Sequence, residues 1–183
     1  MPLRFCILAF VVCLAWALPA RAESMADFLI AGMPVDHRGD ATTLAICVLA
    51  EAGGNRLDHH GILHVLKRRA MQLSERSGHH ISIAEMARRY CRIFRDPPRH
   101  RNFLRALVWA QTPERPGYAH AWQQAQLSVV LFLLEVDLDP CDGRAMHWGS
   151  TADARKPPRR SVRVDCGPTK NVFWTGPLRG TQI

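Results

Sequence analysis

An unbroken apolar run over residues 44–50 constrains the fold of this chain more than any other feature of its sequence. Asp40 before the run is a good helix N-cap and Gly53-Gly54 after it ends a helix, so the sequence predicts a helix over residues 41–52. A helix that is apolar on all sides must be buried. Other elements therefore have to surround it.

Apolar residues at helical spacing predict the elements that would surround this helix. We expect four further helices, at residues 58–76, at 83–94 behind a capping box of Ser82 and Glu85, from Pro97-Pro98 onward, and at 118–136. The last of these ends in an apolar run that is too short to span a bilayer, which indicates a buried core helix.

The two ends of the chain lack this helical periodicity. Residues 23–39 show no clear period and predict an extended lead-in. After Asp139 the sequence is rich in Gly, Pro, Asp and Arg, and the short apolar pieces at 162–164 and 172–174 fit a small β-hairpin. The predicted fold class is mainly α, a helical domain with an irregular C-terminal lobe, and residues 40–183 form one domain by length.

The first 22 residues have the pattern of a secretory signal peptide. Arg4 precedes an apolar run over residues 5–18, Pro19 ends the run, and Ala20-Arg21-Ala22 places small residues where signal peptidase reads them. The run is short for a membrane anchor, and a cleavage site follows it. We therefore expect a periplasmic or secreted protein with no stable membrane span after cleavage.

Cysteine usage agrees with export. Two of the six cysteines lie in the leader, and the even set that remains indicates two disulfides in an oxidising compartment. Three pairings are possible, and our expectation is Cys47–Cys91, joining two helices, with Cys141–Cys166 closing the C-terminal region. A zinc site made of the four cysteines is the less favoured interpretation because no CxxC pair occurs.

The formal net charge of +8 indicates an anionic partner. The positive charge is spread along the chain, and export argues against nucleic acid as that partner. An anionic cell-envelope polymer is the better candidate for an exported protein. Arginines are dense between residues 88 and 105, where Arg88, Arg89 and Arg92 lie opposite the apolar face of the predicted helix 83–94. These arginines form either a solvated face or a contact with that polymer.

Glu51 is the residue best suited to chemistry. It lies in the last turn of the apolar helix, where burial and the partial negative charge of the helix C-terminus both favour a protonated carboxyl. A Glu kept protonated near neutral pH can donate a proton to the leaving oxygen of a glycoside. The adjacent Gly53-Gly54 leaves room for a bulky substrate. The alternative is a Glu that only ends a helix, and position alone does not decide between them.

Four segments, in order, carry a family resemblance. They are Ala-Glu-Ala-Gly-Gly at 50–54, the helix segment 61–68, the Asp-Pro block at 139–148, and Asn-Val-Phe-Trp at 171–174. This ordered set resembles the SleB-like cell-wall hydrolase family. The resemblance implies a lysozyme-like helical fold and an enzyme, hydrolase or lytic transglycosylase, that cleaves peptidoglycan glycan strands. Glu51 would be its general acid.

The chain departs from the family pattern in two places. Lys67 stands where the family usually has Asn, and Arg144 replaces an expected Gly in a loop that is one residue longer after Pro140. These departures keep one alternative open, a non-catalytic cell-envelope binding protein of the same fold.

Candidate substrate contacts come from the matched Asp-Pro block. Sugars bind flat apolar faces, so His147 and Trp148 are the best candidates, with Tyr118 a weaker one. Core packing is the commoner fate of an aromatic residue, and we expect it for the remaining ones, namely Trp109, Trp122 and Trp174.

A two-carboxylate glycosidase also needs a base or nucleophile opposite its acid. Asp139, Asp142 and Asp165 are the candidates, and the sequence does not place any of them near Glu51. A lysozyme-like transglycosylase manages with one Glu, so hydrolysis and transglycosylation both remain open.

The histidines allow a further alternative, a zinc-dependent wall peptidase or amidase. His60 and His64 share a helix face, but the residues between them lack the Glu of the zincin motif. We therefore expect no metal and no cofactor. His59 and the pair His79-His80 are expected to lie in surface loops.

Overall fold

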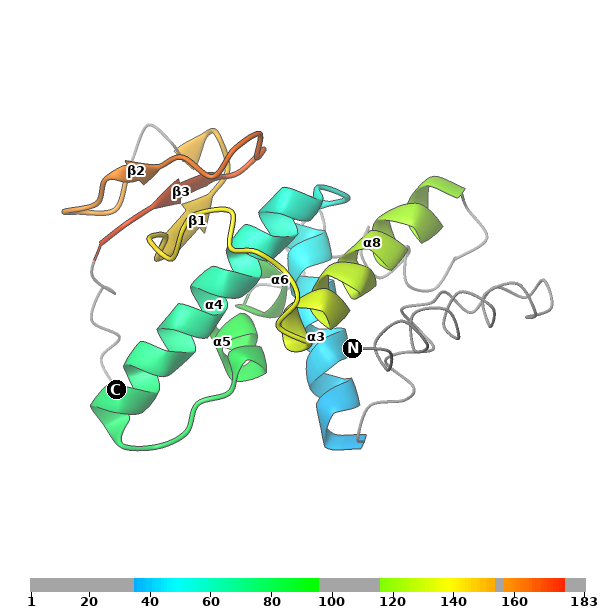
Figure 1. The fold of residues 1–183 in the computed structure, drawn as a ribbon, viewed down its shortest axis with the longest axis horizontal. Helices are drawn as coiled ribbons and strands as arrows, with labels where there is room; N and C mark the ends of the chain where they lie inside the picture. Colours follow the sequence, from blue (N-terminus) through cyan, green and yellow to red (C-terminus); the bar gives the residue numbers. More distant parts are fainter. Residues whose placement is uncertain (1–34, 96–115, 154–156, 177–183) are drawn as a thin grey trace, which may run out of the picture.

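The computed structural model describes residues 35–95, 116–153 and 157–176, and within them helices predominate (Figure 1). The helices are α3 (Val35–Ala52), α4 (Arg56–Ser77), α5 (Ile83–Tyr90), α6 (Arg92–Arg95) and α8 (Pro116–Leu133). α3 packs against α4, α5, α6 and α8, which encloses its apolar run as the sequence predicts. Leu44, Ala45 and Val48 are at most 1 % exposed.

The start of α3 corrects the predicted extended lead-in over residues 23–39 in its last part, residues 35–39. The helix begins at Val35 instead of after Asp40. The hydroxyls of Thr42 and Thr43 donate to the carbonyl oxygens of Arg38 and Gly39 one turn earlier, at 3.0 and 2.9 Å. Asp40 does not cap the helix, because it lies inside α3, and its carboxylate lies 3.6 Å from the guanidinium of Arg88 on α5. Residues 1–34, with the leader, lie outside the described residues.

The ends of α4 and α5 are capped by side chains and backbone. Asn55 caps α4 by accepting a hydrogen bond from the Asp58 N–H at 3.0 Å, and Gly78 ends α4 in the left-handed conformation. Ser82 caps α5 by accepting from the Glu85 N–H at 3.1 Å, as predicted. The helix predicted from Pro97-Pro98 lies outside the described residues.

The C-terminal lobe is a three-stranded antiparallel sheet in the order β1-β3-β2, lying beside α4 (Figure 1). The strands are β1 (His147–Gly149), β2 (Arg163–Val164) and β3 (Val172–Trp174). The predicted hairpin of the last two is confirmed, while β1 was not expected. Phe173 of β3 is 1 % exposed and packs on Gly61 of α4, where an added Cβ would lie 2.7 Å from the ring.

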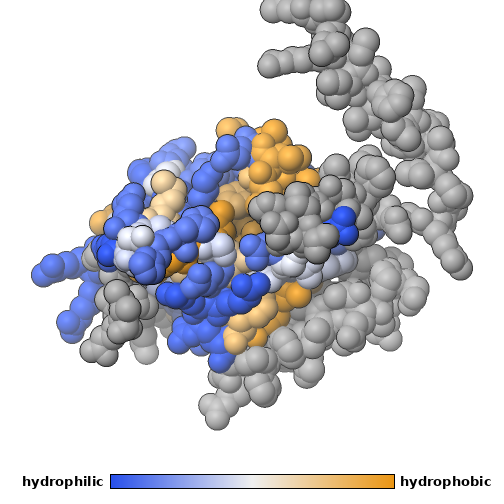
Figure 2. All heavy atoms as spheres, turned by 90° about the horizontal axis from the view of Figure 1, so that it is seen from below, coloured by the Kyte–Doolittle hydropathy of each residue, from blue (hydrophilic) through white to orange (hydrophobic). Residues whose placement is uncertain are grey.

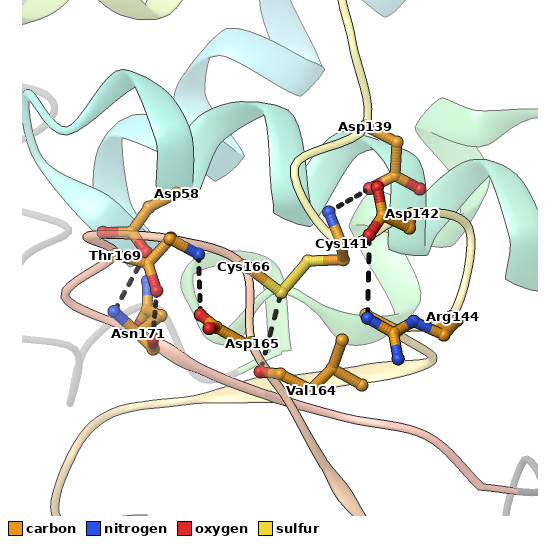
Figure 3. Close-up of a disulfide and its surroundings, with 12 residues drawn as sticks. Asp58, Asp139, Cys141, Asp142, Arg144, Val164, Asp165, Cys166, Thr169 and Asn171 are labelled. Atoms are coloured by element: carbon orange, nitrogen blue, oxygen red, sulfur yellow. Dashed lines mark hydrogen bonds and ion pairs between the residues drawn. A yellow bond between two sulfur atoms is a disulfide. The ribbon is translucent and has the colours of Figure 1, made fainter.

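Both expected disulfides are present. Cys47–Cys91 joins α3 to the residue after α5, and Cys141–Cys166 closes the lobe (Figure 3). Within the described part of the chain, no helix is long and apolar enough to cross a membrane. Figure 2 shows a face on which hydrophilic residues cover much of the described surface, with apolar areas beside them.

Candidate functional site

Glu51 lies in the last turn of α3 and is half-buried. One carboxyl oxygen, Oε1, accepts a hydrogen bond from the backbone N–H of Arg92 at 2.8 Å, at the start of α6. The other, Oε2, accepts from the indole Nε1–H of Trp148 on β1 at 3.4 Å. The carboxyl is therefore held from the helices through one oxygen and from the lobe through the other.

The structure describes the side chains of two of the three predicted sugar-binding residues, Trp148 and His147. Trp148 is half-buried, packs against the core and bonds to Glu51. His147 precedes Trp148 on β1, and its Nδ1 lies 2.8 Å from Nη2 of Arg69, whose guanidinium also lies over the Trp148 ring. Tyr118 belongs to the first turn of α8, and its side chain lies outside the described part.

The other tryptophans give a partial test of the core prediction. Trp174 on β3 is 4 % exposed, and Trp122 on α8 is half-buried against the core, so both predictions are confirmed. Trp109 lies outside the described residues.

Arg69 is a buried cation that the sequence analysis did not single out. It is 6 % exposed, and burial lowers its pKa to about 10, so it keeps its charge at neutral pH. Its Nε–H donates to the carbonyl oxygen of Met146 at 2.8 Å. Its guanidinium carbon lies 4.2 Å from the ring centre of Tyr90 and 5.2 Å from that of Trp148. The signal for it was its place on the inner face of α4, three residues after Leu66.

Asp58 anchors the lobe next to Glu51. It is fully buried and accepts hydrogen bonds from the backbone N–H groups of Lys170 and Asn171, at 3.0 and 2.9 Å. Burial raises the pKa of Asp58, while these two hydrogen bonds act in the opposite direction. The amide of Asn171 in turn donates to the carbonyl oxygen of Glu51 at 3.3 Å. Asp58 and Asn171 lie together at one side of Figure 3.

His59 contradicts the expectation of a surface residue. It is fully buried, with Nε2 2.6 Å from the carbonyl oxygen of Gly53 and Nδ1 3.2 Å from the hydroxyl of Ser128. Burial lowers the pKa of His59 to about 4, so the ring is neutral at pH 7. It connects the turn after Glu51 to α8. His79 and His80 are exposed, as expected.

His60 and His64 share one carboxylate. Their Nδ1 and Nε2 atoms lie 2.8 and 3.0 Å from the same oxygen, Oδ2 of Asp137. The pair on α4 therefore fixes the segment that follows α8. Among the described residues, no group of three or more His, Cys, Asp or Glu side chains is arranged to hold a metal ion.

The three candidates for a second carboxylate make hydrogen bonds or ion pairs within the lobe (Figure 3). Asp139 accepts from the N–H groups of Cys141 and Gly143, both at 2.9 Å, and pairs with Arg68 of α4. Asp142 lies 3.6 Å from Arg144, and Asp165 accepts from the Gly167 N–H at 3.0 Å. Apart from the pair with Arg68, these contacts lie within the turns that contain the three aspartates, as is usual for Asp in turns.

Described residues line two cavities that bear on the site. One, of about 410 Å³, lies along β2 and the loop before β3, and Asn171 is part of its lining. Asn171 donates to the backbone carbonyl oxygen of Glu51, but Glu51 itself is not in the lining of this cavity. The other, of about 540 Å³, lies between α3, α4 and the segment before α5, and Glu51 is not in its lining.

No family model, curated protein or solved structure matches this chain. The family resemblance of the four segments therefore stays a prediction.

Proposed function

We propose that this chain is an exported peptidoglycan glycosidase of the lysozyme-like type, hydrolase or lytic transglycosylase, with Glu51 as its general acid. One observation carries the proposal: the indole N–H of Trp148 bonds to the carboxyl of Glu51 across 97 residues of sequence. The sequence had selected these two residues separately, one as a proton donor and one as a flat surface for a sugar.

The two oxygens of Glu51 are suited to different tasks. Oε1 is anchored by a backbone donor at 2.8 Å, whereas the bond to Oε2 is long at 3.4 Å. Oε2 is thus the oxygen that would hold the proton and deliver it to the glycosidic oxygen as the bond from that oxygen to the sugar carbon breaks. Catalytic hydrogen bonds are often long before substrate binds. Both N–H groups would then stabilise the carboxylate that remains.

The second step of the reaction separates two routes. Hydrolysis by the two-carboxylate mechanism needs a base or nucleophile opposite Glu51. The described contacts of Asp139, Asp142 and Asp165 are with their own turns or with an arginine, and none of these contacts is with Glu51. Transglycosylation needs no second carboxylate, because a hydroxyl of the sugar itself attacks and forms an anhydro end. The ends of the products distinguish the routes.

Export and a polyanionic target agree with other features. Two disulfides are typical of proteins in oxidising compartments. Arg88, Arg89 and Arg92 are exposed, which makes them available to an anionic wall polymer. Such contacts between exposed charges weaken as salt rises.

The test is digestion of purified peptidoglycan by the wild-type protein, by Glu51→Gln and by Glu75→Gln, with the products read by mass spectrometry. Glu75 is an exposed residue of α4 and gives the matched control for loss of one carboxylate. We expect Glu51→Gln to lower the rate of muropeptide release about 10²- to 10⁴-fold, the contribution of a general acid. Glu75→Gln should release muropeptides like the wild type.

Two other results would replace the proposal. Equal binding of the wild type and Glu51→Gln to the wall, with no release by either, would make this a non-catalytic envelope-binding protein. Lys67 is the feature that favours that alternative, because it stands where the family usually has Asn. Its ammonium lies 2.9 Å from the carboxylate of Glu135. Release of peptides that a chelator stops would instead indicate a zinc-dependent peptidase or amidase.

A further inference from the structure

The two N–H groups that bond to the Glu51 carboxyl come from parts of the chain that lie far apart in sequence. Arg92 follows Tyr90 and Cys91 at the end of α5, and Trp148 belongs to β1. The direction of the carboxyl therefore depends on how the end of α5 and strand β1 are placed relative to each other.

Arg69 contacts both of these segments. On the α5 side its guanidinium lies over the ring of Tyr90, two residues before Arg92. On the lobe side it lies over the ring of Trp148 and donates to the carbonyl oxygen of Met146 and to Nδ1 of His147. One side chain of α4 thus touches three consecutive residues of the lobe and the residue that leads into α6.

We infer that Arg69 is a positioning residue, which fixes the orientation of the Glu51 carboxyl by holding Trp148 and the end of α5 in place. The inference rests on the proposed function for its catalytic meaning, while the placement of Trp148 can be measured without any substrate. Arg69 acts through other residues, since its described contacts are with Tyr90, Met146, His147 and Trp148.

The chemistry of these contacts requires arginine. A planar guanidinium can stack on an aromatic ring with its face while its edge donates several hydrogen bonds in fixed directions. The ammonium of lysine is a compact and strongly hydrated charge that cannot do both. Arg69 is also 6 % exposed, so its attraction to the two rings is little screened by water. Arg69→Lys should therefore keep the charge and lose the geometry.

The contact with His147 gives the inference a signature of its own. A guanidinium can only donate, so His147 must accept at Nδ1, and a neutral ring then carries its proton on Nε2. This tautomer is visible in the nitrogen chemical shifts of the ring. Loss of the Arg69 donor should change the proportion of the two tautomers of His147.

The experiment compares nitrogen-labelled wild type, Arg69→Lys and Arg76→Lys. Arg76 is an exposed residue in the last turn of α4, so it controls for the same chemical change on the same helix. The indole N–H signal of Trp148 is assigned with Trp148→Phe, and its position without the carboxylate is given by Glu51→Gln. Arg69→Lys should move that signal toward its Glu51→Gln position and shift His147 away from the Nε2–H form. Arg76→Lys should change neither.

Activity is then measured on soluble, uncross-linked glycan strands. We expect Arg69→Lys to lower kcat about 10²-fold, the effect of a small misplacement of a catalytic group. KM should change less than about threefold, because binding of the ground state is kept. Trp148→Phe keeps a ring against Arg69 and removes the donor to Glu51, so it should lower kcat in the same way even if Arg69→Lys is unstable.

The outcomes separate the inference from the proposed function. Wild-type indole and His147 signals in Arg69→Lys would overturn the inference, as would an unchanged kcat in Trp148→Phe. Failure of the wild type to release any muropeptide would overturn the proposed function instead. In that case the indole and His147 signals still decide whether Arg69 sets the position of Trp148.

Discussion

The helical part of the described molecule and its C-terminal lobe are held together by different forces. In the helices, side chains such as Leu44, Val48 and Leu66 are at most 1 % exposed and pack against one another. The lobe has three short strands and relies on the Cys141–Cys166 disulfide and on carboxylates that accept backbone hydrogen bonds, as Asp58 does. Apolar burial is non-directional, whereas a disulfide and hydrogen bonds hold particular atoms in place.

Glu51 lies where the two parts meet, and this explains why the difference matters for function. Its Oε1 is bonded to the helical part through Arg92 and its Oε2 to the lobe through Trp148. A disturbance confined to the lobe should therefore alter the site while the helices remain folded. The helical part cannot be disturbed in this way without loosening the core around α3.

Removal of each disulfide should give the largest contrast between the two parts. The chain-entropy model assigns about 4 kcal/mol to Cys47–Cys91 and about 3.5 kcal/mol to Cys141–Cys166, from sequence separations of 44 and 25 residues. We expect Cys47→Ala/Cys91→Ala to lower the denaturant midpoint for both helix content and tryptophan fluorescence. Cys141→Ala/Cys166→Ala should lower the fluorescence midpoint more than the helix midpoint.

These two double variants control for each other, since each removes one crosslink and leaves the other. If both probes shifted equally in both variants, the lobe and the helices would unfold as one cooperative unit. The division of the molecule into two parts would then be wrong.

Acid should weaken the helical part through His59. Its pKa is about 4 in the folded protein against an ordinary 6.5, so between these values the unfolded chain binds more protons and stability falls as pH falls. The shift corresponds to about 3 kcal/mol lost between about pH 6.5 and pH 4. His59→Gln keeps an amide that can bond to Gly53 and Ser128 but does not titrate, so its stability should depend less on pH over this range.

The difference between wild type and His59→Gln isolates this residue from its neighbours. Burial lowers the pKa of His60 as well, which acts in the same direction, while the raised pKa of Asp58 acts in the opposite one. Both are present in each protein and cancel in the comparison. Parallel pH profiles of unfolding free energy would contradict the role assigned to His59.

The sequence predicted the helical part well because its signals are local. The apolar run of α3, the Ser82 cap of α5 and the spacing of apolar residues in α4 each follow from neighbouring residues. The start of α3 at Val35 was missed because Asp40 looks like an N-cap but pairs with Arg88. Strand β1 was missed because its pairing partner among the described strands is β3, which is not adjacent to it in sequence.

The residues of the candidate site were selected from the sequence only in part. Glu51 was found from its place at the end of an apolar helix, and Trp148 from the matched block around it. Arg69 and His59 were missed because polar residues usually indicate exposed positions, and these two are buried with partners supplied by distant elements. Nothing near them in sequence indicates those partners.

The smallest effect concerns the contact between the two parts. Gly61→Ala on α4 would place a Cβ 2.7 Å from the buried ring of Phe173, which pairs with Trp148 across β3 and β1. Overpacking costs about 1–3 kcal/mol, and alanine regains about 1 kcal/mol of helix propensity, so we expect a net loss of about 1 kcal/mol in thermal or chemical unfolding. The rate of peptidoglycan cleavage should fall further than this loss explains, because Trp148 moves with Phe173.

Two comparisons sharpen this prediction. Gly39→Ala makes the same change in α3, where nothing lies within 4 Å of the added Cβ, so it should stabilise the protein by up to about 1 kcal/mol. Phe173→Leu removes the ring atoms that Gly61→Ala would touch, so the double variant should cost less than the two single variants added together. If the losses in unfolding free energy of the two single variants simply added, the contact between Gly61 and Phe173 would not be what couples α4 to β3. The position of Trp148 would then depend on its other contacts, including that with Arg69.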